Sequence, residues 1–234
     1  MMIGSKVDFD INDLYIPKDV KEDIDYQKSF SATLTIIVRD KDGNVIKRYK
    51  QKSHSPTANF IGLMIPLTWY VNTGNSWTFK NTSNSTFSYE SSIAMPGFGM
   101  GYPCSGSNHN DYIVNILVGS GSQSNPYSAY NLNAPISNGS GTGQLLYSSI
   151  STPTSITING SQAYFIISQS YANQSGGTIT ISEVGIITYL NFTSTTNTTT
   201  TPGNTLMWYD VLSSPISVGN GQSVVIYYTF SVNA

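Results

Sequence analysis

Positive charge is missing from the last two thirds of this chain. After Lys80 the sequence contains no lysine and no arginine, and residues 81–234 carry only four acidic side chains, which are Glu90, Asp111, Glu183 and Asp210. An average soluble protein is about one quarter charged, so this stretch must stay soluble through its many serine, threonine and asparagine residues. Without basic side chains it offers no surface for the phosphates of a nucleic acid. We therefore expect no nucleic acid among the partners of residues 81–234.

Cysteine and long apolar segments are also scarce. The single Cys104 excludes an intramolecular disulfide. The longest apolar run, residues 61–71, is about half as long as a membrane span and contains Pro66. Charged residues interrupt the first ten positions, so they lack the apolar core of a signal peptide. We therefore expect a protein that is made in a cytoplasm without a signal peptide and has no membrane span.

The charges that are present are concentrated in the N-terminal part. Residues 1–80 hold all 11 basic and nine of the 13 acidic side chains. Val7, Phe9 and Ile11 alternate with polar residues there, which permits a strand. The charged residues that follow form either a solvated connector or an arm that docks on a neighbouring subunit. This contrast divides the chain into a charged part, 1–80, and an uncharged part, 81–234, unless residues 29–80 form one continuous domain with the second part.

The apolar pattern predicts an all-β fold. Residues 29–52 have the pattern of a hairpin, in which Asp40-Lys41-Asp42-Gly43 supplies the turn. Later stretches rich in Ile, Val, Tyr, Phe and Thr are separated by Gly, Pro, Asn and Ser, which is typical of a β-sandwich. We expect a jelly-roll-like antiparallel β-sandwich with exposed loops at 96–110 and at the threonine-rich 192–204. The predicted strands are 86–89, 112–118, 144–150, 155–158, 163–171, 178–190, 206–212 and 223–232.

One short helix is expected near residues 56–66. Ser55-Pro56 is a typical helix start, because serine caps free N–H groups and proline fits the first helical position. Apolar residues follow at spacings of three and four. Together with two nearby tryptophans they are candidates for contact with a neighbouring subunit, or for a small core beside the sandwich. These candidate interface residues are Phe60, Leu63, Met64, Trp69 and Trp77.

Few side chains are suited to catalysis or metal binding. The two histidines are His54, expected in a loop before the helix, and His109. Cys104, His109 and Asp111 lie close together in the sequence, but their spacing matches no common metal site or Cys–His catalytic arrangement. We therefore predict no catalytic residue, no metal and no cofactor.

The acidic residues of the uncharged part offer little for acid–base chemistry. A glycosidase needs two carboxylates that face each other across the substrate. Glu183 lies within a predicted strand, and we interpret it as a structural carboxylate that is hydrogen-bonded to backbone or hydroxyl groups. Asp210 lies near a predicted strand end, where we expect it to orient a turn.

Sequons of the Asn-x-Ser/Thr type occur throughout the uncharged part. Glycosylation at such sites also requires that the protein reach the glycosylating compartment. The sequence is compatible with sugar attachment and does not require it. The candidate acceptors are Asn81, Asn84, Asn138, Asn159, Asn173, Asn191 and Asn197.

The order of several short motifs resembles that in minor virion structural proteins, of the tail, fibre or turret type, from archaeal viruses and some phages. The motifs are the hairpin from Ile37 to Gly43, Lys52 to Ser55 followed by Asn59-Phe60, the strand TITISEVG at 178–185, DVLSSPISV at 210–218 and the final GQSVVIYYT at 221–229. The match covers about residues 30–60 and 175–232. In that resemblance the last strands belong to a β-sandwich that assembles with copies of itself. It implies no catalytic residues.

These observations together predict a non-enzymatic virion structural protein. We expect it in a tail, nozzle, turret or fibre of a virus that infects a thermophilic archaeon. Its expected partners are copies of itself, in a ring or trimer, other virion proteins and, in one alternative, host surface glycans. The same composition also fits a cell-surface adhesin or filament subunit, and a carbohydrate-binding module of a receptor-binding spike is a third alternative.

Overall fold

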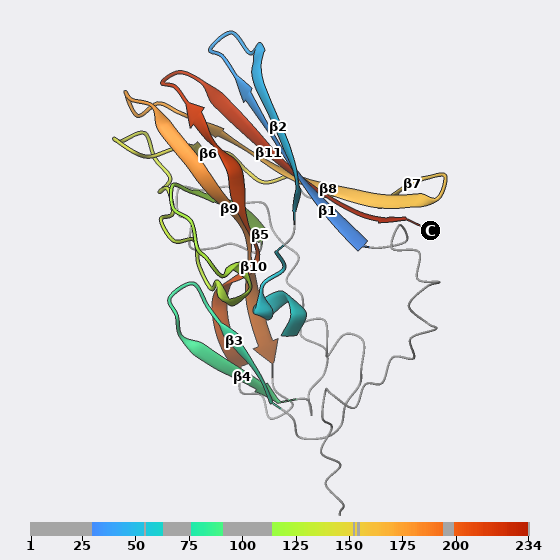
Figure 1. Ribbon diagram of the computed structural model, residues 1–234. Helices are drawn as coiled ribbons and strands as arrows, with labels where there is room; N and C mark the ends of the chain where they lie inside the picture. Colours follow the sequence, from blue (N-terminus) through green and yellow to red (C-terminus); the bar gives the residue numbers. More distant parts are fainter. Residues whose placement is uncertain are drawn as a thin grey trace, which may run out of the picture.

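The computed structural model describes residues 30–53, 55–62, 76–90, 114–151, 153, 155–193 and 199–233. These residues form an antiparallel all-β sandwich, as the sequence predicted (Figure 1). Sheet A has the order β2-β1-β11-β8-β6, and β7 pairs with β8; its strands are β1 (Phe30–Arg39), β2 (Val45–Ser53), β6 (Leu146–Tyr147), β7 (Thr157–Asn159), β8 (Gln162–Ala172) and β11 (Ser223–Asn233). Sheet B has the order β10-β9-β5, from β5 (Val114–Gly119), β9 (Ile179–Thr193) and β10 (Thr199–Val218). A small third sheet pairs β3 (Ser76–Lys80) with β4 (Thr86–Glu90).

The main core lies between sheets A and B. In β1, every second residue from Ala32 to Val38 points to this core, and the corresponding residues of β11 from Val224 to Phe230 do the same. Sheet B contributes Ile116, Ile186 and their neighbours from its inner face. This alternation of buried and outward residues is the period of a strand with one buried face. It explains why the apolar pattern alone was sufficient to predict the sandwich.

The N-terminal hairpin is an integral part of sheet A. Strand β1 lies between β2 and the C-terminal strand β11, with Phe30 paired to Val232 at one end and Arg39 to Ser223 at the other. The change in charge at Lys80 therefore does not coincide with a division between the two sheets. Charged and uncharged segments share one sheet and one core.

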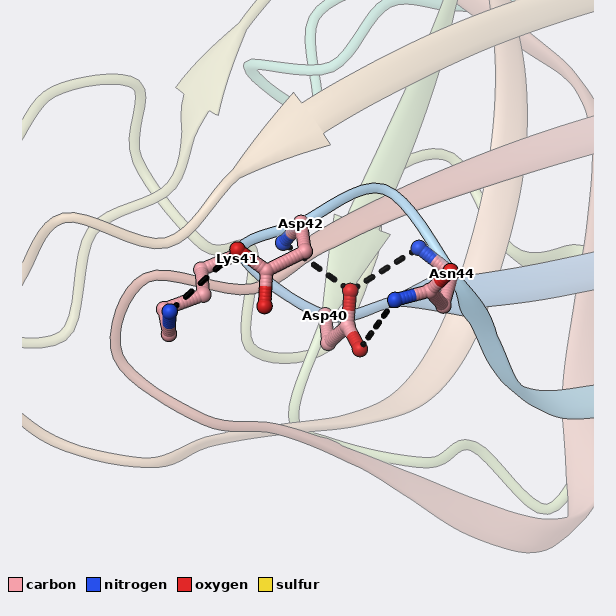
Figure 2. A network of polar contacts seen from close by, with 4 residues as sticks. All are labelled: Asp40, Lys41, Asp42 and Asn44. Atoms are coloured by element: carbon pink, nitrogen blue, oxygen red, sulfur yellow. Dashed lines mark hydrogen bonds and ion pairs between the residues drawn. The ribbon is translucent and has the colours of Figure 1, made fainter.

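The turn of this hairpin is built by its acidic and amide side chains (Figure 2). The carboxylate of Asp40 accepts hydrogen bonds from the backbone N–H of Asp42 (2.9 Å) and from the backbone and side-chain N–H groups of Asn44 (2.8 and 3.1 Å). These bonds, foremost the one from the Asn44 side chain, lower the pKa of Asp40 below its ordinary value of 3.8. Gly43 adopts φ +86°, which glycine reaches without steric strain. The predicted turn is confirmed.

The start of the predicted helix is displaced. Residues 58–62 are helical, and the residues beyond 62 lie outside the described part. Pro56 does not occupy the first helical position, because it forms a β-bridge with Trp208 in β10. The backbone carbonyl of Ser55 accepts a hydrogen bond from the N–H of Tyr209 (3.0 Å). The residues that resembled a helix cap are therefore held by pairing with β10.

The threonine-rich stretch was wrongly predicted to be an exposed loop over 192–204. Strand β9 continues to Thr193 and β10 begins at Thr199, where the two residues pair with each other. Only residues 194–198 lie outside the described part between these strands. Threonine is β-branched and favours strands, so the tract extends a hairpin. In contrast, the strand predicted at 144–150 is only two residues long, and β3 was not predicted.

Candidate functional site

A loop covers the outer face of sheet B, which is the face turned away from sheet A. The loop follows β5 and contains the 3-10 turn Pro126–Ser128. Ala129 and Leu132 of the loop pack against Ile187, Leu206 and Tyr209 of sheet B, where they form a second, smaller apolar core. Strand β9 is therefore covered on both of its faces in this region, by sheet A on one side and by the loop on the other.

Glu183 in β9 lies beneath this loop and is fully buried. Its carboxylate accepts hydrogen bonds from the backbone N–H groups of Gly121 (3.3 Å), Asn133 (3.0 Å) and Ala134 (2.7 Å). The hydroxyl of Tyr209 donates a further bond of 2.6 Å. Such bonds to an ionised acceptor are stronger than neutral ones. Glu183 therefore fixes the loop to the sheet, and its interpretation as a structural carboxylate is confirmed by these contacts.

Asp210 lies in β10 and points the other way, into the main core. Its carboxylate accepts hydrogen bonds from the hydroxyl of Tyr228 in β11 (2.9 Å) and from that of Ser53 in β2. The indole N–H of Trp208 donates to the same Ser53 hydroxyl. Burial raises the pKa of Tyr228, and the charge of Asp210 raises it further. The prediction that Asp210 orients a turn is wrong, because β10 continues through it and the carboxylate joins the two sheets.

Glu183 and Asp210 lie on opposite faces of sheet B. Asp210 pairs with Val184 across the β9–β10 ladder, and successive residues of a strand point to opposite faces. The two carboxylates therefore cannot face each other across one substrate, as a glycosidase requires. Each carboxylate accepts several hydrogen bonds within the protein and connects segments of the fold.

The other candidates for chemistry lie outside the described residues. These are His54, Cys104, His109 and Asp111. Within the described ranges, no three His, Cys, Asp or Glu side chains come together in a group that could hold a metal ion. The same part of the chain contains no helix with the length and apolar character needed to cross a membrane.

The candidate glycosylation sites differ in their accessibility. Asn159 is exposed beside the β7–β8 turn, and Asn84 is exposed after β3. The side-chain oxygen of Asn81 accepts backbone hydrogen bonds within its own turn, and that of Asn138 accepts one from the backbone N–H of Tyr147. The side chain of Asn191 and all of Asn197 lie outside the description.

Asn173 is fully buried, which contradicts its selection as a glycosylation site. Its side-chain nitrogen donates to the carbonyls of Gly177 (2.8 Å) and Val218 (2.7 Å), and its oxygen accepts from the backbone and hydroxyl of Ser175. A glycan attached to this nitrogen would displace those bonds. The residue closes a loop and cannot carry a sugar in the folded protein.

Among the candidate interface residues, only the side chain of Phe60 is described. Its ring packs edge to face against Trp208, with the ring centroids 5.3 Å apart, and borders the main core. This arrangement favours the alternative of a core contact over a subunit contact. Leu63, Met64 and Trp69 lie outside the described residues, as does the side chain of Trp77.

Sequence reasoning missed an exposed apolar row on the inner face of sheet A. Phe30 pairs with Val232, Val232 with Ala163 and Ala163 with Ile158, across β1, β11, β8 and β7. Directly paired residues lie on the same face of a sheet, so these four side chains form a continuous line, which we call the apolar row. Phe30 is 51%, Val232 48% and Ile158 77% exposed.

The apolar row continues the main core beyond the strands that cover it. The ring of Phe30 lies 6.0 Å from that of Phe230 and 6.3 Å from that of Trp208, both of which belong to the core. From there the row follows the end of sheet A that carries β7 and the end of β11, and this end extends beyond sheet B (Figure 1). The row thus belongs to a core-facing surface that sheet B leaves open.

Three of the four residues of the apolar row, in β7, β8 and β11, lie in a part of the chain whose described surface is polar and uncharged. From residue 114 onward the described chain contains two ionisable acids and no lysine or arginine, and both acids, Glu183 and Asp210, are buried. The exposed polar groups are therefore hydroxyls and amides. The lack of charge is visible in the sequence. The apolar row is not, because it depends on pairing among four strands that are far apart in the sequence.

Comparisons of the chain with protein-family models, with curated proteins and with solved structures found no match.

Proposed function

We propose that this protein is a non-enzymatic structural subunit of a virion, which assembles with copies of itself in a tail, nozzle, turret or fibre. The apolar row is the observation that carries the proposal. Exposed apolar side chains that are contiguous and rimmed by polar residues are typical of protein–protein contact sites. Because the row lies on a core-facing surface, a partner that covers it would complete the sandwich.

The uncharged surface supports self-association. Copies of a strongly charged protein repel one another unless their charges are complementary. The described surface from residue 114 onward has no charged side chain, so identical subunits approach one another there without this repulsion. Repeated subunits usually form closed symmetric assemblies, and a ring or a trimer is the form that we propose.

The virion as location, with other virion proteins as neighbours, rests on the resemblance of the sequence motifs. Mass spectrometry of purified virions, compared with envelope fractions of the host, tests this part directly. We expect peptides of the chain in the virions. Their recovery only from the host envelope would contradict the proposal and favour an adhesin or filament subunit.

The assembly surface is tested by size-exclusion chromatography with light scattering. We expect the wild type to form a defined oligomer and the variant Phe30→Ser with Val232→Ser to be monomeric. Ile46→Ser is the matched control, because Ile46 is also 51% exposed but lies in β2, away from the row. Circular dichroism must show that each variant is folded. A monomeric wild type, or a row variant that assembles as the wild type does, would contradict the proposal.

A further inference from the structure

Strand β2 forms one edge of sheet A. It pairs with β1 on one side, and no other strand of the described chain pairs with its second side. Along an edge strand, alternate residues direct their backbone N–H and C=O groups away from the sheet. Another strand can pair with these groups and extend the sheet, which is a common mode of peptide recognition.

The outer face of this edge is strongly basic. Arg48, Lys50 and Lys52 occupy alternate positions of β2 and are exposed. Their partners in β1 are Ile37, Thr35 and Thr33, which alternate with the residues that point to the main core; Thr35 and Thr33 are half-buried and Ile37 is buried. Three positive charges are therefore arranged at a spacing of two residues, along the side of the strand that faces away from the core.

The described residues leave these charges without a counterion. The ion pair found there joins Lys41 to Asp42 at the hairpin turn, at 3.2 Å. The other acid of the turn, Asp40, is engaged by Asn44 (Figure 2). Beyond residue 113 both described acids are buried. Within the described ranges, therefore, no acidic side chain neutralises the basic edge.

The sequence contains a segment whose pattern complements this edge. Residues 7–13, which lie outside the described part, read Val-Asp-Phe-Asp-Ile-Asn-Asp. If this segment is extended, Val7, Phe9 and Ile11 lie on one face together with the terminal Asp13, and Asp8, Asp10 and Asn12 lie on the other. The acidic side chains thus recur with the same two-residue period as the basic side chains of β2.

We propose that residues 7–13 add to sheet A as a strand beside β2 of the same chain. In this arrangement Asp8 and Asp10 face the basic residues of the outer face. Val7, Phe9 and Ile11 then lie on the inner face, beside Tyr49, which already packs against the core. The strand neutralises the basic edge and protects its backbone groups. This proposal does not depend on the virion function.

The connecting residues are long enough for pairing within one chain. Residues 14–29 provide 16 residues between the segment and the start of β1, which span at most about 55 Å when extended. Strand β2 has nine residues and is about 30 Å long. The segment can therefore reach the edge in either direction. A short tether also gives it an effective concentration of about a millimolar, which favours its own edge over that of a distant copy.

Hydrogen–deuterium exchange of the full chain, read by mass spectrometry over residues 45–53, tests this pairing. We expect the variant Asp8→Lys with Asp10→Lys to raise the exchange rate of the β2 amides by about tenfold or more, because the strand opens locally. The variant Arg48→Glu with Lys50→Glu should have the same effect. Combining all four substitutions should restore slow exchange, because the charges are again complementary. The matched control is Asp19→Lys with Asp23→Lys, which makes an equal change of charge in the connecting residues and should leave β2 unchanged.

Three results would overturn the proposal. The first is equal β2 exchange in the wild type and in the Asp8 and Asp10 variant. The second is a fourfold variant that fails to restore protection, since simple loss of structure is not reversed by a second charge reversal. The third is wild-type protection that disappears on dilution, which would assign the edge to the arm of a second copy. Protection that is independent of concentration and restored by the fourfold variant is the expected result.

Discussion

The β1–β2 hairpin and the rest of the sandwich use charge in opposite ways. Six of the seven described basic residues lie between Arg39 and Lys52, and those of β2 are exposed on an edge strand. From residue 114 onward the described surface is uncharged, and the two acids of this part are buried as hydrogen-bond acceptors. Both regions share sheet A, so the difference does not arise from separate folds. Charged side chains are exposed along a strand edge in one region, and they are internal hydrogen-bond acceptors in the other.

This comparison has a direct consequence for mutations. Removing an exposed charge from the hairpin takes away a solvated group with weak interactions. Removing a buried carboxylate from the uncharged region leaves several buried donors without an acceptor. Removing one charged side chain is therefore expected to lower the free energy of unfolding only slightly in the hairpin and strongly in the uncharged region.

The largest effect is expected at high pH, where ionisation of buried tyrosines would place negative charges inside the uncharged region. Burial raises the pKa of four tyrosines above the ordinary value of 10.0, and these are Tyr147, Tyr171, Tyr209 and Tyr228. The unfolded chain releases these protons near pH 10 while the folded chain keeps them, so stability is complete below that pH and falls above it. Each tyrosine contributes about 1.4 kcal/mol per pH unit, so the free energy of unfolding should fall by about 6 kcal/mol at about pH 11.

Urea unfolding followed by circular dichroism measures this loss, and absorbance at the tyrosinate band shows when the phenols ionise. We expect these four phenols to ionise only as the protein unfolds. Tyrosines that all titrate in the folded state near pH 10, with no loss of stability, would contradict the account.

The second effect concerns Glu183. Glu183→Ala should lower the free energy of unfolding by about 4 kcal/mol, because three loop N–H groups and the Tyr209 hydroxyl lose a charged acceptor. Glu183→Gln keeps one accepting oxygen and should lower it by about half as much. The control from the other region is Lys47→Gln, at an exposed residue of β2 that is not part of its basic outer face, expected to change stability by less than about 0.5 kcal/mol. Equal effects of the Glu183 and Lys47 substitutions on denaturant unfolding would remove the distinction between the regions.

The third effect concerns the close packing of the loop on sheet B. A Cβ atom at Gly185 would lie 2.7 Å from Leu206 Cδ1 and 3.0 Å from both Leu132 Cδ2 and the Trp208 carbonyl oxygen. Gly185→Ala should therefore lower the free energy of unfolding by about 2 kcal/mol through overpacking. Gly177→Ala is the matched control, since nothing lies within 4 Å of its added Cβ. If thermal unfolding shows the same small change for both variants, the loop is not packed as described.

Much of the sandwich could be predicted from the sequence, because strands with one buried face have a local apolar period. The hairpin turn was also accessible, since Asp40 and Gly43 act within a few residues. The structural role of Glu183 followed from its position among apolar strand residues in a chain with few charges. In each case the deciding interactions were local or imposed by burial.

The errors arise where distant pairing decides the structure. Pro56 resembled a helix start until it paired with Trp208, and Asp210 resembled a turn residue although it bonds to Ser53 and Tyr228 in the opposite sheet. The threonine tract was judged by its polarity, whereas hairpin pairing extends strands into it. The apolar row combines residues from four strands, and no local pattern could show that they lie together.

The contrast between the two regions is tested most directly by the effect of salt on self-association. The measurement is sedimentation velocity of the wild type at about 0.05 M and about 0.5 M NaCl. Because salt screens exposed charges, it weakens an interface held by charged side chains and leaves an uncharged interface nearly unchanged. Association through the apolar row predicts an oligomer at both concentrations, with an association constant that changes by less than about threefold. Dissociation of the oligomer at high salt would assign the interface to the basic hairpin, and that result, or a monomer in both conditions, would contradict the account.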